Sequence, residues 1–284
     1  MTAVRAERRR VPWLLLLPGL LWLAVFFLVP LGTLVSTSLQ TGSLEQGYRL
    51  TFAWATYADV WTTYRGQLVR SFTYAGSATV LALLIGYPLA YAIALKVGRW
   101  RNLMLVLVVA PFFTSFLLRT LAWKIVLADD GWVVGALQGL GLLPGTGRLL
   151  ATPAAVVLGL TYNFLPFMVL PIYASLEKMD PLLLEAAGDL HATPATAFRT
   201  VTWPLSLPGV VAGTLLTFIP AAGDYVNVQF LGTPRSQMIG NVVESRFLTV
   251  LDYPAAAALS LTLMTGVLLL VLAYVRRVGA RGLP

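Results

Sequence analysis

Few side chains in this 284-residue chain could do catalytic or metal chemistry. There is one histidine, His191, and no cysteine, which excludes disulfides, thiolate metal sites and cysteine nucleophiles. A single histidine supplies neither a metal cluster nor a catalytic triad, so the convergent titratable groups of a membrane-embedded enzyme are missing. The sequence contains no GxxxxGK[ST] phosphate-binding loop, because none of the lysines, Lys96, Lys124 and Lys178, follows a glycine. If the function of this chain depends on nucleotide hydrolysis, another chain has to bind and hydrolyse the nucleotide.

Three formal charges lie inside long apolar stretches, although a charged side chain at the bilayer centre costs about 2.5–3.5 kcal/mol. At about 1.5 Å of rise per residue, Arg119 and Asp224 are expected in the outer third of the bilayer and Lys124 near its outer interface. Lys124 is expected to extend its side chain to that interface. Arg119 and Asp224 either form a structural ion pair or face a cavity mouth, where they contact the solute or a docked binding protein. Asn163 and Asn227 are further polar candidates, which helix–helix hydrogen bonds would also explain.

The longest polar interruption between two apolar stretches, residues 177–208, contains two helix starts. Each start pairs a capping side chain with a proline at the first helical position, where the missing N–H costs nothing. The two starts are Asp180-Pro181 and Thr193-Pro194. The second helix is predicted to run toward Trp203 and to end at Pro204 and Pro208. The sequence thus predicts a helix-turn-helix between two spans; a long amphipathic loop on the membrane surface is the alternative.

The first of these helices is predicted to be amphipathic. Its apolar residues follow i, i+3, i+4, i+7 spacing and so share one face. They are Leu183, Ala186, Ala187 and Leu190. Glu185 and Asp189 lie on the other side of the helix.

The same segment resembles the EAA loop of ABC importer permeases, which docks into a cleft on a partner ATPase. The family pattern is E-A-A-x3-G-x9-I-x-L-P. This chain has Glu185, Ala186 and Ala187, then His191 in place of Gly, Val201 in place of Ile, Trp203 in place of Leu, and Pro204. The resemblance implies a set of ATPase-coupling residues in this loop. They are Glu185, Ala186, Ala187, Asp189, His191 and Pro204.

The composition is that of a polytopic membrane protein. The chain is 58% hydrophobic and 11% charged, with a mean hydropathy of +0.78, whereas a soluble domain is about 25% charged. So few charges cannot cover a water-facing surface of this size. The net charge of +8 is better explained by a bias between loops than by nucleic-acid binding.

The fold class that follows is an all-α polytopic membrane protein with six transmembrane helices and a cytoplasmic helix-turn-helix coupling loop. A basic leader at 1–12 precedes a permease domain at 13–276, and a short tail at 277–284 follows it. Each span has about the 20 residues that a helix needs to cross the hydrocarbon. The predicted spans are about 13–35, 71–95, 102–127, 152–176, 209–231 and 254–274. A cleaved signal peptide is the alternative for the first, but its apolar core would be only roughly 7–15 residues long.

Basic residues orient these spans. With both termini inside, the inner segments carry twice as many lysines and arginines as the outer segments. The coupling loop at 177–208 is then cytoplasmic, on the side where an ATPase would be. The spans also contain prolines, which are expected to kink the helices. They are Pro88, Pro111, Pro166, Pro171 and Pro220.

Three further segments narrow the resemblance. PFFTSFLLRTLAW at 111–123, TYNFLPFMVLPIYASL at 161–176 and GDYVNVQFLG at 223–232 are similar to the spermidine/putrescine-type permeases, and to the first of their two permease subunits. With the EAA-like loop, the similarity covers roughly residues 70–275. We expect the substrate pathway to involve six residues in these spans. They are Arg119, Tyr162, Asn163, Asp224, Tyr225 and Asn227.

The resemblance implies a non-catalytic transport subunit in the bacterial inner membrane. Such a subunit binds no cofactor itself and works with a second permease, ATPase subunits that hold ATP and Mg²⁺, and a periplasmic binding protein. Alternating access would move a small solute, with a polyamine as the first expectation and ferric iron as an alternative from the same branch. Outside the family the alternative is a secondary transporter, which needs coupling carboxylates near mid-membrane. Asp224 is the only candidate for one, and its expected position is not central.

Overall fold

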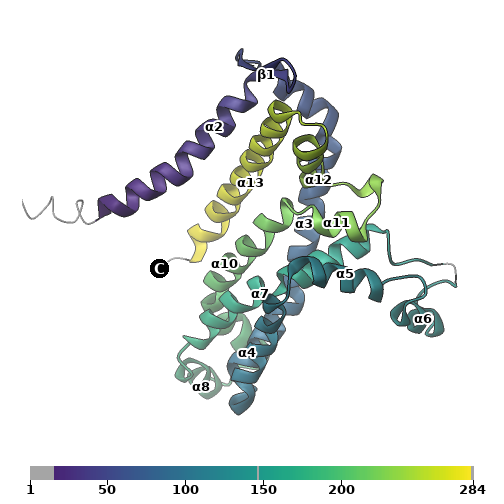
Figure 1. Cartoon of the computed structure of the whole chain (residues 1–284). Helices are drawn as coiled ribbons and strands as arrows, with labels where there is room; N and C mark the ends of the chain where they lie inside the picture. Colours follow the sequence, from purple (N-terminus) through teal and green to yellow (C-terminus); the bar gives the residue numbers. More distant parts are fainter. Residues whose placement is uncertain (1–15, 146, 283–284) are drawn as a thin grey trace, which may run out of the picture. The chain divides into compact units, whose positions relative to one another are not determined.

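The computed structural model describes residues 16–145 and 147–282 (Figure 1). Five of its helices are long and apolar enough to cross a membrane, and a bent helix pair makes a sixth span if the pair is counted as one. The five are Leu16–Ser38, Ala55–Leu95, Pro153–Glu177, Pro194–Ala222 and Tyr253–Arg277. The predicted helical membrane fold is confirmed. The predicted leader at 1–12, the first residues of the predicted first span and the last two residues of the tail lie outside the described residues.

One compact unit comprises residues 16–63 and Val243–Thr262. Its elements are a π-helical turn at Ala24–Leu28, α2 at Val29–Ser38, β1 at Gln40–Ser43, β2 at Gly47–Leu50, a π-helical turn at Ser245–Thr249 and the first part of α13 at Tyr253–Gly282. The strands form an antiparallel hairpin in which Gln40 lies opposite Leu50. Tyr48 of this hairpin donates a hydrogen bond of 2.5 Å to the Leu251 carbonyl, which ties the hairpin to the start of α13.

The second unit comprises Tyr64–Val242 and the chain from Leu263 onward, and it contains every predicted site residue. Its helices are the main part of α3 at Ala55–Leu95, α4 at Arg101–Val109, α5 at Phe116–Val126, α6 at Trp132–Gly139, α7 at Pro153–Glu177, α8 at Leu182–Asp189, α9 at Pro194–Ala197, α10 at Trp203–Ala222, α11 at Val226–Leu231 and the first part of α12 at Ile239–Glu244. Short 3-10 turns lie at Gly98–Trp100, Ala110–Phe113 and Pro234–Ser236, and a π-helical turn lies at Phe198–Thr202.

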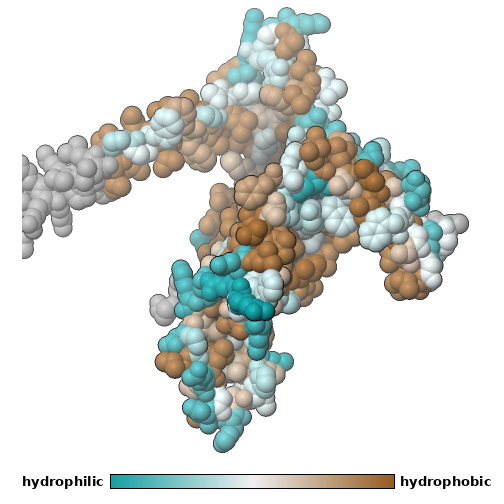
Figure 2. All heavy atoms as spheres, turned by 60° about the horizontal axis from the view of Figure 1, so that its bottom comes forward, coloured by the Kyte–Doolittle hydropathy of each residue, from teal (hydrophilic) through white to brown (hydrophobic). Residues whose placement is uncertain are grey.

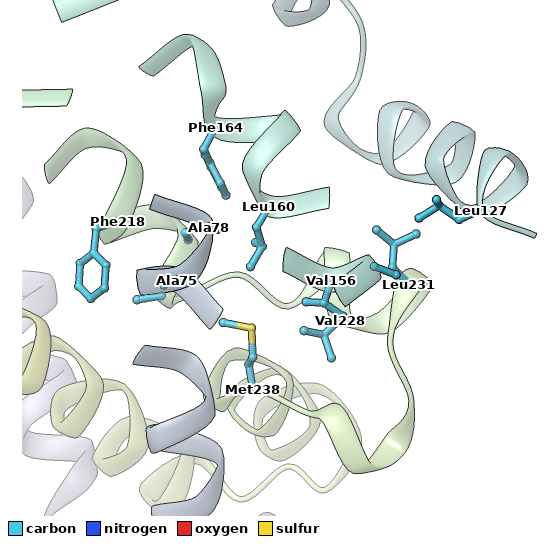
Figure 3. Packing of buried hydrophobic residues seen from close by; sticks show 13 residues of the cluster. Ala75, Ala78, Leu127, Val156, Leu160, Phe164, Phe218, Val228, Leu231 and Met238 are labelled. Atoms are coloured by element: carbon cyan, nitrogen blue, oxygen red, sulfur yellow. The ribbon is translucent and has the colours of Figure 1, made fainter. Parts of the chain in front are cut away.

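Helix α7 is the most enclosed of the helices that are long enough to cross a membrane, because 61% of its most apolar 18-residue stretch is buried. It packs along α10, where Gly209 and Gly213 let the two backbones approach closely. A first apolar cluster joins α7 to α3, α10 and α11 (Figure 3). Its labelled members include Ala75, Ala78, Val156, Leu160, Phe164, Phe218, Leu231 and Met238. A second cluster, around Ile93, Met168 and Ile172, joins the C-terminal halves of α3 and α7.

The third predicted span, a single helix over 102–127, is wrong in this form. The structure divides it into Gly98–Phe113 and Phe116–Val126, which meet at 97°. Pro111 is the second residue of the 3-10 turn at Ala110–Phe113, and Thr114 and Ser115 then take extended backbone conformations that end the helix. The sequence predicts a kink at Pro111, whereas the structure has a complete break.

The helix of the second predicted span begins earlier than residue 71. It starts at Ala55 and continues without interruption through Pro88 to Leu95. The sequence predicts a polar connection over residues 36–70, because the hydropathy of this segment is low. A helix needs no apolar composition outside the bilayer, and no proline precedes Pro88 in this segment.

Candidate coupling elbow and transport pathway

The segment between α7 and α10, residues 177–208, folds as the predicted helix-turn-helix, which we call the elbow. Both predicted caps are present. The Leu182 amide donates to the Asp180 carboxylate over 3.0 Å at the start of α8. The Thr196 amide donates to the Thr193 hydroxyl over 3.3 Å at the start of α9. These side chains satisfy backbone donors that a helix start otherwise leaves free.

His191 forms the turn between the two helices of the elbow. Its φ is +57°, in the left-handed region that favours glycine. The Ala192 amide donates to the Ala187 carbonyl over 3.0 Å, and the His191 amide donates to the Gly188 carbonyl over 2.8 Å. This pair of bonds is a Schellman C-cap, in which the left-handed residue is usually glycine. This geometry suits the glycine of the family pattern, and in this chain His191 adopts the left-handed conformation instead.

We expect a glycine at this position to make the elbow more rigid. A left-handed conformation costs a non-glycine residue roughly 1–2 kcal/mol, so His191→Gly should slow hydrogen exchange of the Ala192 amide. His191→Val should accelerate it, because a β-branched side chain tolerates this region poorly. His191→Asn, which tolerates the region, is the matched control and should stay close to the parent chain. Equal exchange rates in the glycine and valine variants would contradict this account of the turn.

The second helix of the elbow does not end at Pro204 and Pro208 as the sequence predicts. Helix α9, the π-helical turn and α10 form one continuous helix from Pro194 to Ala222. The π-helical turn at Phe198–Thr202 widens the helix immediately before Pro204, so the proline ring is accommodated without a break. The elbow is therefore directly continuous with a membrane-spanning helix.

Aromatic side chains attach this helix to α3. The ring of Tyr87 lies 5.3 Å from that of Trp203 and 5.7 Å from that of Phe198. The Tyr87 and Ser206 hydroxyls share a buried hydrogen bond of 2.8 Å. Trp203, which replaces the usual leucine, thus contributes to a packed contact between the elbow and α3.

Helix α8 has no buried residue. The side chains of Leu182, Leu183 and Leu190 are 64%, 45% and 83% exposed. Glu185 and Asp189 are exposed as well. Hydrophobic side chains also cover much of the outside of the long helices, while hydrophilic side chains gather around the elbow (Figure 2). The apolar face of α8 is therefore left uncovered by the described part of this chain.

Helices α5, α7 and α11 meet around a chain of buried polar side chains. Asn163 of α7 donates to the Thr120 hydroxyl over 3.2 Å and to the Asn227 carbonyl oxygen over 3.0 Å. The backbone and side-chain amides of Asn227 donate to one carboxylate oxygen of Asp224 over 2.8 and 3.2 Å. The structure thus brings together the predicted residues Asn163, Asn227 and Asp224. Thr120 was not predicted, because a threonine inside an apolar stretch gives no distinct signal.

Asp224 does not lie within a helix. The predicted fifth span, 209–231, is interrupted because α10 ends at Ala222 and α11 starts at Val226. Asp224 occupies this interruption, is 8% exposed and caps α11 through its contact with Asn227. Glycine and the capping carboxylate favour a turn at this point over a continuous helix.

The suggested Arg119–Asp224 ion pair is not formed. Arg119 has no carboxylate within ion-pair distance in the described residues, and its Cζ lies 5.3 Å from the Phe112 ring centre and 5.6 Å from that of Phe116. Tyr162 packs its ring 5.4 Å from Trp123, and Tyr225 is 42% exposed. The six predicted pathway residues therefore form one hydrogen-bonded group with three separate neighbours.

The structure also shows polar contacts that the sequence does not indicate. Asn241 donates to the Tyr225 carbonyl over 2.9 Å and so fixes the interruption after α10. Arg101 pairs with Glu177 at the end of α7, and its guanidinium lies over the Tyr173 ring. Within the described residues, no group of three or more histidines, aspartates and glutamates is arranged to hold a metal ion.

Residues 78–281 match the family model described as "Binding-protein-dependent transport system inner membrane component". The chain is 38% identical over 253 residues to the spermidine/putrescine transport system permease protein PotB of Salmonella typhimurium (strain SL1344), with 88% of each chain covered. Identity to the PotB protein of Escherichia coli (strain K12) is 37% over 253 residues, covering 88% of this chain and 92% of the relative.

The fold is also found in a solved transporter. A crystal structure of a bacterial ABC transporter involved in import of the acidic polysaccharide alginate contains a chain that matches with a TM-score of 0.70, at 17% identity and with 99% of both chains covered. At this identity the likeness shows the fold alone. The matched family model, the 38% identity and the shared helical architecture agree: the chain belongs to the inner-membrane components of binding-protein-dependent transport systems, the non-catalytic, multi-pass permease subunits of ABC importers.

Proposed function

We propose that this permease carries a polyamine such as spermidine or putrescine across the inner membrane. The relatives from Salmonella and Escherichia, similar over most of their length, are named for these solutes. The solute would arrive on a periplasmic binding protein and cross by alternating access. A second permease and two ATPase subunits complete the importer, with ATP and Mg²⁺ held by the ATPases. Both termini and the elbow lie on the cytoplasmic side, which the excess of basic residues in the inner segments supports.

The uncovered face of α8 is the observation that supports ATPase coupling most directly. An isolated eight-residue helix is marginal in water, yet α8, which has no buried residue, has a capped start and a closed Schellman end. Such a helix is suited to bury its apolar face in a cleft of another protein. Because the elbow continues into α10, a displacement of α8 by the ATPases moves a membrane helix directly.

The buried polar group supplies the supporting chemistry for the solute. One carboxylate oxygen of Asp224 is occupied by Asn227, and the other oxygen makes no hydrogen bond to the described residues. A carboxylate in this setting suits the ammonium group of an amine. The exposed ring of Tyr225, next to it in sequence, offers a face for a cation.

Reconstitution tests this function. The importer, placed in proteoliposomes with its binding protein, should accumulate radiolabelled spermidine only when ATP is enclosed on the elbow side. Unlabelled putrescine should compete, and ferric iron should not. ATP-independent uptake would indicate a secondary transporter, and competition by iron alone would assign the other solute.

Asp224→Asn should reduce spermidine uptake about tenfold or more at low solute concentration. The asparagine keeps an oxygen for the Asn227 amides, so the start of α11 is preserved, but it removes the charge. A charge-assisted hydrogen bond contributes about 1.5–3 kcal/mol, which corresponds to at least tenfold in affinity. The readout is the solute concentration for half-maximal uptake, alongside the melting temperature. Uptake equal to that of the parent chain would exclude Asp224 from the solute's route.

A further inference from the structure

Arg119 is buried without an anionic partner in the described part of the chain. Its side chain is 9% exposed, and its Nε and Nη1 atoms are enclosed without a hydrogen-bond acceptor. The rings of Phe112 and Phe116 stabilise the cation through their electron-rich faces. They do not satisfy its N–H donors. Since a buried charge is costly unless it is paired and hydrogen-bonded, the enclosed guanidinium points to an anion supplied by another molecule.

The backbone beside this guanidinium also favours an anion. Helix α5 starts after the 97° break, and its first residues receive no cap from the Ser115 side chain. Free N–H groups and the helix dipole make such a start electropositive. The positions of the Phe112 and Phe116 rings, on either side of the break, place the guanidinium at this end of α5. The helix start and the guanidinium therefore both attract an anion to the same place.

The surroundings indicate what carries the anion. Nε and Nη1 are enclosed, so an outside group reaches the guanidinium through Nη2. At the break and along α5, Phe113, Leu118 and Ile125 are 87%, 62% and 73% exposed. An occupant that covers these side chains and also neutralises Arg119 must present an apolar surface with a carboxylate in it. A polyamine has neither, and an unpaired cation would repel it.

We propose that the α4–α5 break is a docking surface for the second permease subunit of the importer, and that an aspartate or glutamate of that subunit pairs with Arg119. The inference rests on the proposed function, which assembles this chain with a second permease. The accessible Nη2 group can donate a charge-assisted hydrogen bond to this carboxylate, and the enclosed remainder of the guanidinium fixes the direction of that bond. Pairing cancels a positive charge on a subunit that conducts a cationic solute.

The test uses the assembled importer in detergent, captured through a tag on this chain. The quantity measured is the second permease retained after washing. Arg119→Gln should weaken retention about a hundredfold, because the partner's carboxylate is then buried without a cation. Lys124→Gln, on the same helix but exposed, should retain it like the parent chain. Arg119→Lys keeps the charge and should fall between the two, which separates loss of the pair from misfolding.

A charge exchange makes the test specific. Arg119→Glu should also lose the second permease, and lysine at one of the partner's acidic positions should restore retention. Equal retention by the parent chain and Arg119→Gln overturns the docking surface. A variant that retains its partner but loses uptake only of carboxylate-bearing solutes assigns the anion to the solute and overturns it too. If the parent chain itself retains no second permease, the proposed function fails instead.

Discussion

Leucine in place of Gly209 is expected to prevent assembly of the folded permease. The glycine lies where α10 crosses α7, and a Cβ added there would lie 2.5 Å from the Pro171 carbonyl oxygen and 2.9 Å from the Ile172 Cα. Both are backbone atoms of α7, which cannot rotate away. Overpacking a core typically costs about 1–3 kcal/mol, and a backbone clash belongs at the upper end or beyond. The measurement is the yield of monodisperse permease and its melting temperature.

Gly213, one turn further along α10, makes the same kind of approach, since its added Cβ would lie 3.0 Å from the Met168 carbonyl oxygen. Small residues four apart are a common way for membrane helices to pack closely. Gly76 of α3 is the control, because nothing lies within 4 Å of its added Cβ. Gly76→Leu should leave yield and melting temperature unchanged. Parent-like behaviour of Gly209→Leu would show that α7 and α10 are not packed as described.

Hydropathy and capping chemistry predicted the parts of the fold that depend on local sequence. The number of apolar runs follows from the cost of exposing polar backbone to lipid, and the elbow follows from the caps at Asp180 and Thr193. The effect of each proline on its helix was predicted less successfully. Pro111 precedes a complete break, whereas Pro204 lies inside a continuous helix because a π-helical turn compensates for it. Tertiary packing decides between these outcomes, and a single sequence does not contain that information.

The residues of the candidate pathway were likewise predicted correctly only in part. Asn163 and Asn227 were singled out as polar residues in apolar stretches, and they are in direct contact. Depth along a span also suggested pairing Arg119 with Asp224, but depth does not specify which face of a helix a residue occupies. The break before α5 and the interruption after α10 change the course of the backbone next to Arg119 and at Asp224. A sequence argument that assumes straight spans cannot anticipate either change.

Glu185→Ala is expected to uncouple ATP hydrolysis from uptake while the permease itself stays folded. Glu185 is exposed on α8, a helix without buried residues. If the ATPase cleft donates a hydrogen bond to this carboxylate, its loss should cost about 1.5–3 kcal/mol of docking free energy, or roughly tenfold to a hundredfold in affinity. The experiment measures ATPase binding to the purified permease pair, and then solute moved per ATP hydrolysed.

Two features make this measurement decisive for the elbow. The parent and variant chains should melt at the same temperature, because no hydrogen bond or ion pair of Glu185 is found among the described residues that could be lost. Asp130→Ala, which removes an exposed acid outside the elbow, is the matched control and should bind the ATPase normally. Since α8 continues through the turn at His191 into the helix from Pro194 to Ala222, weaker docking must reduce the force that reaches the membrane. Normal binding together with normal coupling in Glu185→Ala would mean that the ATPase engages another part of the chain.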